Sequence, residues 1–164
     1  MLTLRVIFMK IDWKKLVIAV AVPLAIGGLA ALLTAGSMEG FDKLKQPFLS
    51  PPAWLFPVAW TILYTLMGIA SYRIWTAVTT YEKRKQALFA YGAQLFFNFV
   101  WSIIFFNLQE YFFAFVWLVG LWLLIYVTWA QFKQIDRVAG WLLIPYLVWV
   151  GFAGYLNLGI WWLN

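Results

Sequence analysis

Long apolar runs separated by short polar stretches dominate the sequence. A membrane-spanning helix needs about 20 consecutive, mostly apolar residues, and five runs reach that length. The predicted spans are residues 16–35, 54–78, 87–108, 111–132 and 141–163. The links between the last four spans are short, so these helices must run antiparallel to their neighbours. We therefore expect an all-α membrane protein, with residues 1–164 forming a single domain that is a compact bundle of five transmembrane helices.

The first connection is the exception, because it runs from Gly36 to Ala53. Links within helix bundles usually have about 2–8 residues, and longer ones are functional or disordered. This loop contains large apolar residues such as Phe41 and Phe48, which a disordered tether does not need. We expect a partly ordered loop that acts as a lid over one end of the bundle. Ser50 is predicted to cap the second helix, with Pro51 at its first position.

Composition agrees with a membrane environment. Hydrophobic residues make up 65% of the chain and charged residues 11%, against about 25% charged residues in soluble domains. A chain of this kind cannot provide a polar coat, so its surrounding solvent must be lipid. The net charge of +6 lies in short clusters between the apolar runs. That pattern indicates topology signals and contact with lipid headgroups, and it does not indicate nucleic-acid binding.

Basic residues also predict the orientation of the bundle. Ten of them fall in the N-terminal tail, around the second link and in the fourth link, whereas the opposite end has two, Lys43 and Lys45. By the positive-inside rule the N-terminus is cytoplasmic and the C-terminus lies outside. The basic N-terminal segment is also compatible with a signal peptide. A retained first helix is favoured, because the run at 16–35 is long enough to span and no A-x-A motif follows it.

The residue types that are missing exclude much chemistry. The sequence contains no histidine and no cysteine, which removes disulfides, thiolate nucleophiles and the usual general base near neutral pH. No metal site is predicted. The only charged residue within a predicted span is Arg73, near the end of the second helix. Ion pumps and proton relays need ionisable groups inside the membrane, so ion-coupled transport is disfavoured.

Polar and aromatic residues recur at helical spacing on three predicted helices. The three stripes are Trp60, Tyr64, Gly68 and Ser71; Gln94, Asn98, Trp101, Ser102 and Phe105; and Tyr146, Trp149, Ala153 and Asn157. Each stripe alone is compatible with ordinary packing of membrane helices. Together they favour a cavity for a flat apolar ligand with a few polar edges.

Several motifs resemble those of one family. The first loop and second helix contain FDKLKQPFLSPP at 41–52 and WTILY at 60–64, and the third and fifth helices contain QLFFNFVWS at 94–102 and WLLIPYLVW at 141–149. Their order and spacing resemble the TspO family of tryptophan-rich sensory proteins and translocator proteins, also known as peripheral-type benzodiazepine receptors. The resemblance covers nearly the whole chain from the first loop onward.

The resemblance implies a five-helix bundle, often dimeric, that binds porphyrins such as protoporphyrin IX under the first loop. By matching position, Trp60 and Trp149 correspond to pocket tryptophans, Asn98 and Trp101 to one wall, Ala153 to a small wall residue, and Phe41 and Pro51 to the lid. Two features depart from the family pattern: Gly40-Phe41 replaces Trp-Tyr, and Gln46 replaces a lysine. The family's cholesterol motif is incomplete because no basic residue follows Tyr155, so cholesterol binding is not predicted.

The three stripes of polar and aromatic residues and the resemblance to the TspO family together give the set of residues that we expect to bind the ligand. It comprises Phe41, Pro51, Trp60, Tyr64, Gln94, Asn98, Trp101, Tyr146, Trp149 and Ala153. Lys43 and Lys45, with Gln46, are expected to bind the porphyrin propionates. Without histidine or cysteine, tight axial ligation of haem iron is disfavoured, so the expected ligand is a metal-free porphyrin and no covalent cofactor is predicted.

Three functions stay open at this point. The leading one is tetrapyrrole sensing, sequestration or transport in contact with membrane lipid. The second is light-dependent porphyrin breakdown, in which Trp60 and Trp149 would take part in the chemistry of the pigment. The third is a non-catalytic membrane assembly subunit. Small-residue faces at Gly27-x-x-x-Ala31 and Ala90-x-x-Ala93 are compatible with a homodimer.

Overall fold

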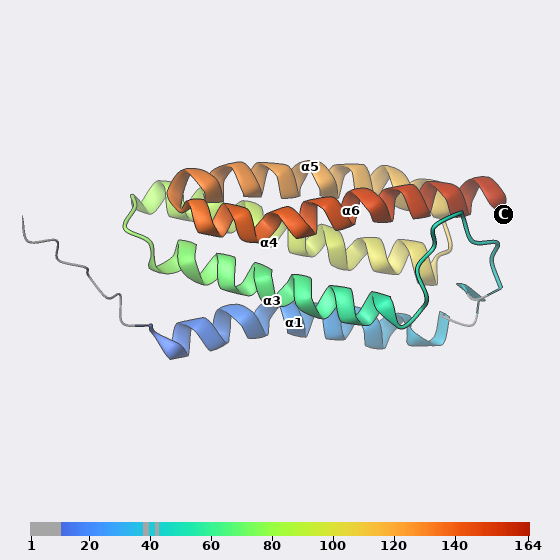
Figure 1. The fold of residues 1–164 in the computed structure, drawn as a ribbon, viewed down its shortest axis with the longest axis horizontal. Helices are drawn as coiled ribbons and strands as arrows, with labels where there is room; N and C mark the ends of the chain where they lie inside the picture. Colours follow the sequence, from blue (N-terminus) through green and yellow to red (C-terminus); the bar gives the residue numbers. More distant parts are fainter. Residues whose placement is uncertain (1–10, 38–39, 42) are drawn as a thin grey trace, which may run out of the picture.

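The computed structural model describes residues 11–37, 40–41 and 43–164. Within these residues the chain forms five long helices and no strand (Figure 1). The helices are α1 (Trp13–Thr34), α3 (Leu55–Thr76), α4 (Tyr81–Ser102), α5 (Tyr111–Ile135) and α6 (Arg137–Leu163). A 3₁₀ turn, η1 (Ala35–Ser37), follows α1, and a π-helix, η2 (Ile103–Asn107), continues α4. All five helices are long and apolar enough to cross a membrane, which confirms the predicted fold class.

The links alternate between the two ends of the bundle. The start of α1, the α3–α4 link and the α5–α6 link lie at one end, whereas the first loop, the α4–α5 link and the C-terminus lie at the other (Figure 1). Short links therefore produce the expected antiparallel neighbours, and the long first loop lies over one end. The basic residues Arg5 and Lys10, which contribute to the predicted orientation, fall outside the described residues.

Side-chain caps set several helix starts. The Asp12 carboxylate accepts a hydrogen bond from the Lys15 backbone N–H at 3.1 Å, so α1 begins at Trp13. Thr80 caps α4 in the same way. The basic run that includes Lys83 and Lys85 was predicted as part of a link and instead lies in the first two turns of α4. The prediction missed this because it followed hydropathy, whereas the threonine cap starts the helix before the apolar run begins.

The predicted cap at Ser50 is wrong. Helix α3 begins at Leu55, with Trp54 before it and no side-chain cap, and the Ser50 hydroxyl lies 3.4 Å from Gln46 Oε1 instead. The reason is the Pro51-Pro52 pair, because a residue that precedes proline is sterically kept out of the α-helical region. The helix therefore starts only after both prolines.

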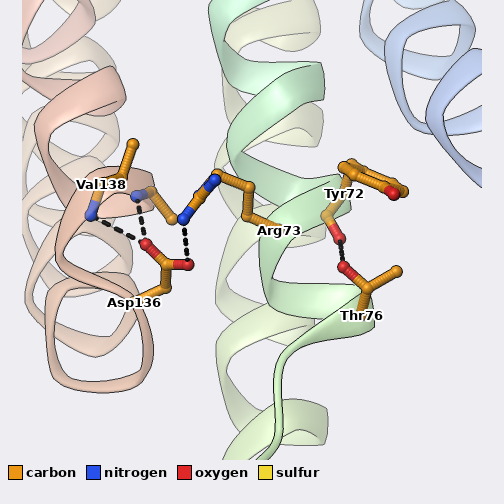
Figure 2. A network of polar contacts seen from close by, with 6 residues as sticks. Tyr72, Arg73, Thr76, Asp136 and Val138 are labelled. Carbon is orange, nitrogen blue, oxygen red and sulfur yellow. Dashed lines mark hydrogen bonds and ion pairs between the residues drawn. The ribbon is translucent and has the colours of Figure 1, made fainter. Parts of the chain in front are cut away.

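An ion pair joins α3 to the α5–α6 junction (Figure 2). The Arg73 guanidinium donates to Asp136 Oδ2 at 2.7 Å, and Asp136 Oδ1 accepts from the backbone N–H groups of Val138 and Ala139. Asp136 is therefore the cap of α6, which begins at Arg137 and not at the predicted residue 141. Burial acts to raise the pKa of Asp136, but the hydrogen bonds from Arg73 and the two amides outweigh it and hold this pKa below its usual range.

Glycines allow α1 and α3 to pack closely. A Cβ on Gly27 would overlap the Tyr64 ring, and one on Gly68 would lie 2.5 Å from Val20 Cα and 2.8 Å from the Ala19 carbonyl oxygen. Pro23 cannot donate to the Ala19 carbonyl, and Gly68 brings the α3 backbone against this same group. Gly27 thus packs within the chain, whereas Ala31, the other residue of the predicted Gly27-x-x-x-Ala31 face, is exposed. The homodimer stays a prediction.

Candidate ligand-binding cavity

A cavity of about 600 Å³ lies between the helices, beneath the first loop. Its walls come from α1, α3, α4, η2 and α6, together with residues of the loop. Aromatic side chains contribute much of the surface, and they are Phe41, Phe56, Trp60, Tyr64, Trp101, Phe105, Phe106 and Trp149. This volume falls within the roughly 300–1,000 Å³ of typical small-molecule sites.

The rings are held in place by contacts with one another. Trp60 stacks on Tyr64, with 5.4 Å between ring centroids, and meets Tyr146 edge-on at 6.2 Å. On the opposite wall Trp101 stacks on Phe105 at 5.3 Å. Such contacts stabilise ring positions by about 0.5–1.5 kcal/mol per pair, so the cavity offers preformed aromatic faces.

The π-helix turns two of these rings into the site. Phe105 and Phe106 both lie within η2, and both line the cavity. Consecutive residues of a regular α-helix point about 100° apart, and a π-type turn changes where the following side chains emerge. The sequence gives no signal for this element, although Phe105 belongs to the predicted stripe.

Several polar groups at the cavity wall are satisfied within the protein. The Trp101 indole N–H donates to Asn157 Oδ1 at 3.1 Å, and Asn157 Nδ2 donates to the Tyr111 carbonyl at 2.7 Å. The Thr61 and Ser102 hydroxyls donate to backbone carbonyls of their own helices. The hydroxyl oxygens keep their acceptor capacity, so the lining presents a mostly apolar surface with a few acceptors.

A second polar cluster lies behind the aromatic wall. Tyr146 Oη accepts from Asn98 Nδ2 and donates to Gln94 Oε1, each at 2.8 Å, and all three side chains are almost fully buried. Gln94, Asn98 and Tyr146 were predicted to contact ligand, but none of them lines the cavity. They join α4 to α6 and support Trp60 from behind, because Tyr146 packs against it.

The first loop covers the cavity and is fastened to α6. Phe41 packs against Phe105 and Phe106, with centroid separations of 5.8 and 5.5 Å. Buried Pro47 contacts α6, where a Cβ on Gly159 would lie 2.6 Å from Pro47 Cβ. The Tyr155 hydroxyl donates to the Phe48 carbonyl at 2.6 Å. These contacts hold the described part of the loop against α6 and η2, at the position expected for a lid.

The structure brings together six of the predicted ligand-binding residues in the cavity lining: Phe41, Trp60, Tyr64, Trp101, Trp149 and Ala153. Pro51, Lys43 and Lys45 lie on the loop outside the lining, and both lysines are exposed. Gln46 does line the cavity. The α1 wall was missed entirely, although it contributes seven lining residues: Leu24, Gly27, Gly28, Ala30, Ala31, Thr34 and, in η1, Ala35.

Comparison with known proteins agrees with this architecture. The sequence profile of the TspO/MBR family matches residues 19–163. This chain belongs to the TspO/MBR family. The matched region contains every residue that lines the cavity, so the TspO/MBR similarity extends to the whole candidate site. Family membership and the five apolar helices together identify an integral, multi-pass membrane protein.

Individual members of the TspO/MBR family are similar over most of their length. The tryptophan-rich sensory protein of Cereibacter sphaeroides is 38% identical over 149 residues, which cover 91% of this chain and 90% of the relative. The tryptophan-rich protein TspO of Archaeoglobus fulgidus is 38% identical over 151 residues, or 92% and 97% of the two chains. The translocator protein of Bos taurus is 35% identical over 139 residues, or 82% and 81%.

Proposed function

We propose that this TspO/MBR protein binds a metal-free porphyrin such as protoporphyrin IX in the cavity, and so senses, sequesters or transports tetrapyrroles. The observation that carries the proposal is the lining, in which Trp60, Trp101 and Trp149 surround about 600 Å³ of mostly apolar space under the first loop. A porphyrin is a flat aromatic plate with two carboxylates at one edge, and this cavity offers ring faces together with one polar rim.

The energetics favour a metal-free ring. Each aromatic pair contributes about 0.5–1.5 kcal/mol beyond apolar burial, and burial adds about 25 cal/mol for each Å² removed from water. Iron in a haem needs axial ligands, for which histidine and cysteine are the common choices, and the sequence contains neither. Stacking and burial therefore have to provide the affinity.

The propionates would lie at the loop end of the cavity. Gln46 lines the cavity there, and its carbonyl oxygen Oε1 faces the Ser50 hydroxyl, which orients its amide N–H₂ group away from Ser50. Lys43 and Lys45 stand exposed on the same short segment of the loop. In this proposal the Gln46 amide donates to one propionate, and the lysine side chains swing over the rim to pair with the carboxylates.

A dark titration of the detergent-purified protein with protoporphyrin IX tests the proposal. The porphyrin absorbance shift and the tryptophan fluorescence are followed in the wild type and in a Trp60→Phe, Trp149→Phe variant. The matched control is Trp13→Phe, Trp162→Phe, which removes the same number of tryptophans from exposed positions outside the lining.

Saturable binding of about one porphyrin per chain is expected, weakened roughly tenfold in the cavity variant and unchanged in the control. A linear signal that both variants share would mean partitioning into the micelle and would contradict porphyrin binding. A Lys43→Glu, Lys45→Glu variant tests the rim separately, and an unchanged affinity would refute the role of the lysines alone.

Light-dependent breakdown of the bound porphyrin is a second candidate. The feature that favours it is the stack of oxidisable rings, Trp60 on Tyr64, at the cavity wall. Any such chemistry would start from the excited pigment, since the protein supplies position and surroundings. Analysis of products after illumination under air separates breakdown from binding alone. A complete lack of saturable tetrapyrrole binding would favour the third candidate, an assembly subunit.

A further inference from the structure

The cavity lining is unequally exposed. Among the described lining residues, the exposed ones on the helices and their ends are Gly28, Ala31 and Ala35 along α1 and η1, and Ala53, Pro57 and Thr61 along the start of α3. On the opposite wall, every described lining residue of α4, η2 and α6 is buried or half-buried. On the first loop, the lining residue Phe41 is half-buried and Gln46 is exposed. The cavity is therefore closed on the α4 and α6 wall, and most of its exposed lining residues lie beside α1 and α3.

The exposed residues form the two edges of one opening. Gly28, Ala31 and Ala35 follow the i, i+3, i+7 spacing of a single helical stripe, and Ala53, Pro57 and Thr61 follow i, i+4, i+8. Antiparallel packing of Gly27 against Tyr64 and of Val20 against Gly68 sets the register. In that register the stretch of α1 after Gly27 lies opposite the stretch of α3 before Tyr64, so the two stripes face each other across a slot.

The slot lies at membrane depth. At about 1.5 Å per residue, Gly28 and Thr61 each lie about 9 Å inside the ends of their helices. The neighbouring outward-facing residues are apolar, namely Leu32, Val58 and Ile62, and all three are exposed. The rim of the slot thus faces lipid chains and not water.

Small side chains keep the slot open. Four of the six edge residues are glycine or alanine, and a Cβ on Gly28 would meet no atom within 4 Å. Deeper in the membrane the Gly27–Tyr64 contact closes the gap between the helices. At the other end the loop is held on α6 by Pro47 and by the Tyr155 hydrogen bond. The route between α1 and α3 is therefore preformed, whereas a route through the loop requires these contacts to break.

We propose that the slot between α1 and α3 is the entry port of the cavity, through which a flat amphiphile dissolved in the bilayer slides in edge-first. The proposal rests on porphyrin binding for its ligand, whereas the slot itself is formed by residues along α1, η1 and the start of α3 alone. It gives Ala31, Thr61 and their neighbours, which also line the cavity, a further role in the rate of uptake.

Uptake kinetics test the port. Protoporphyrin IX preloaded in vesicles is transferred in the dark to protein reconstituted in vesicles, and the rate is compared between Ala31→Phe at the slot edge and Leu32→Phe on the lipid-facing side of the same turn. Ala31→Phe should slow uptake by about tenfold or more, as expected when binding needs a prior movement. Because Ala31 also lines the cavity, the affinity at equilibrium is measured alongside, and the slowing of uptake should exceed any loss of affinity. Leu32→Phe should behave as wild type in both measurements.

A third variant addresses the competing route. Tyr155→Phe removes the hydrogen bond to the Phe48 carbonyl and so loosens the loop. Uptake through the slot predicts an unchanged rate in this variant. Faster uptake with Tyr155→Phe, together with a wild-type rate for Ala31→Phe, would overturn the proposal in favour of entry through the loop.

An accessibility measurement separates failure of the port from failure of porphyrin binding. The sequence contains no cysteine, so Ala31→Cys gives a unique site for a nitroxide spin label in the ligand-free protein. The relaxation rate of the spin label is measured with lipid-soluble oxygen and with a water-soluble nickel chelate. Faster relaxation with oxygen and no change with the nickel chelate support a slot that is open to lipid. The reverse pattern refutes the port, whatever the porphyrin titration shows.

Discussion

Adjacent glycines on α1 meet very different surroundings. A Cβ on Gly27 would overlap the Tyr64 ring, whereas one on Gly28 would meet nothing within 4 Å. Both residues are glycines in the same helix, so alanine substitutions at the two positions separate the effect of packing from that of helix propensity.

We predict that Gly27→Ala destabilises the protein by about 1–3 kcal/mol through overpacking and displaces Tyr64 from its stack on Trp60. Gly28→Ala, the matched control, should be neutral or slightly stabilising, since alanine is the better helix former. Thermal unfolding in detergent measures both. Equal stabilities for the two variants would contradict the close α1–α3 contact.

Tyr146 carries the polar cluster behind the aromatic wall. Tyr146→Phe would leave Asn98 Nδ2 and Gln94 Oε1 buried without their partner. We expect a loss of about 1–2 kcal/mol in the free energy of unfolding, while the cavity lining keeps its shape. Tyr126→Phe, at an exposed position on α5, should change stability little. Unfolding of both variants under one set of conditions tests the difference, and equal losses would argue against the cluster.

The helical periodicity of the sequence identified part of the cavity lining, residue by residue. Trp60, Trp101, Trp149 and Ala153 were found because rings and small residues recur at helical spacing. Gln94 and Asn98 share that spacing but lie below the cavity, since periodicity gives the face of a helix and not the depth along it. The α1 wall was missed because α1 is apolar on all sides, so no polar contrast indicates its inner face.

Among the elements, α6 depends on the group that starts it. The Asp136 carboxylate accepts hydrogen bonds from two backbone N–H groups of α6 and forms an ion pair with Arg73 of α3. Hydropathy placed the start of this helix four residues too late, because it counts apolar residues and not caps. The central parts of the helices were predicted well, because a helix that crosses a bilayer needs a long apolar run, and hydropathy detects such runs.

The lowered pKa of Asp136 gives α6 a pH dependence. Because the folded pKa is depressed, the stabilisation is fully present above the unfolded pKa of about 3.9 and is lost as pH falls through the folded pKa. Asp136→Asn should cost about 1 kcal/mol at neutral pH, a modest value because water screens the partly exposed pair. The difference from wild type should shrink as the pH falls below about 4.

Unfolding temperatures of wild type and Asp136→Asn between neutral and acidic pH measure this effect. Glu110→Gln is the matched control, since the exposed Glu110 precedes α5 without capping it. A difference between wild type and Asp136→Asn that stays constant with pH would contradict a contribution from the ionised carboxylate.

For the whole molecule, the basic residues predict that the end bearing the α3–α4 and α5–α6 links is cytoplasmic and that the end covered by the first loop lies on the other side of the membrane. Fusion of reporters to the C-terminus tests this. Alkaline phosphatase, which is active only outside the cytoplasm, should be active, and green fluorescent protein should be dark. The opposite result would reverse the predicted orientation.

The central claim is that the cavity itself holds the porphyrin, and filling it tests this most directly. Ala153→Phe places a ring in the cavity without removing any aromatic wall residue, and Val148→Phe adds a ring on the exposed face of the same helix. The measurement is the affinity of each folded variant for protoporphyrin IX in the dark. We predict at least a tenfold loss, or about 1.4 kcal/mol, for Ala153→Phe and wild-type affinity for Val148→Phe. Unchanged binding in the Ala153→Phe variant would place the porphyrin elsewhere and contradict the account.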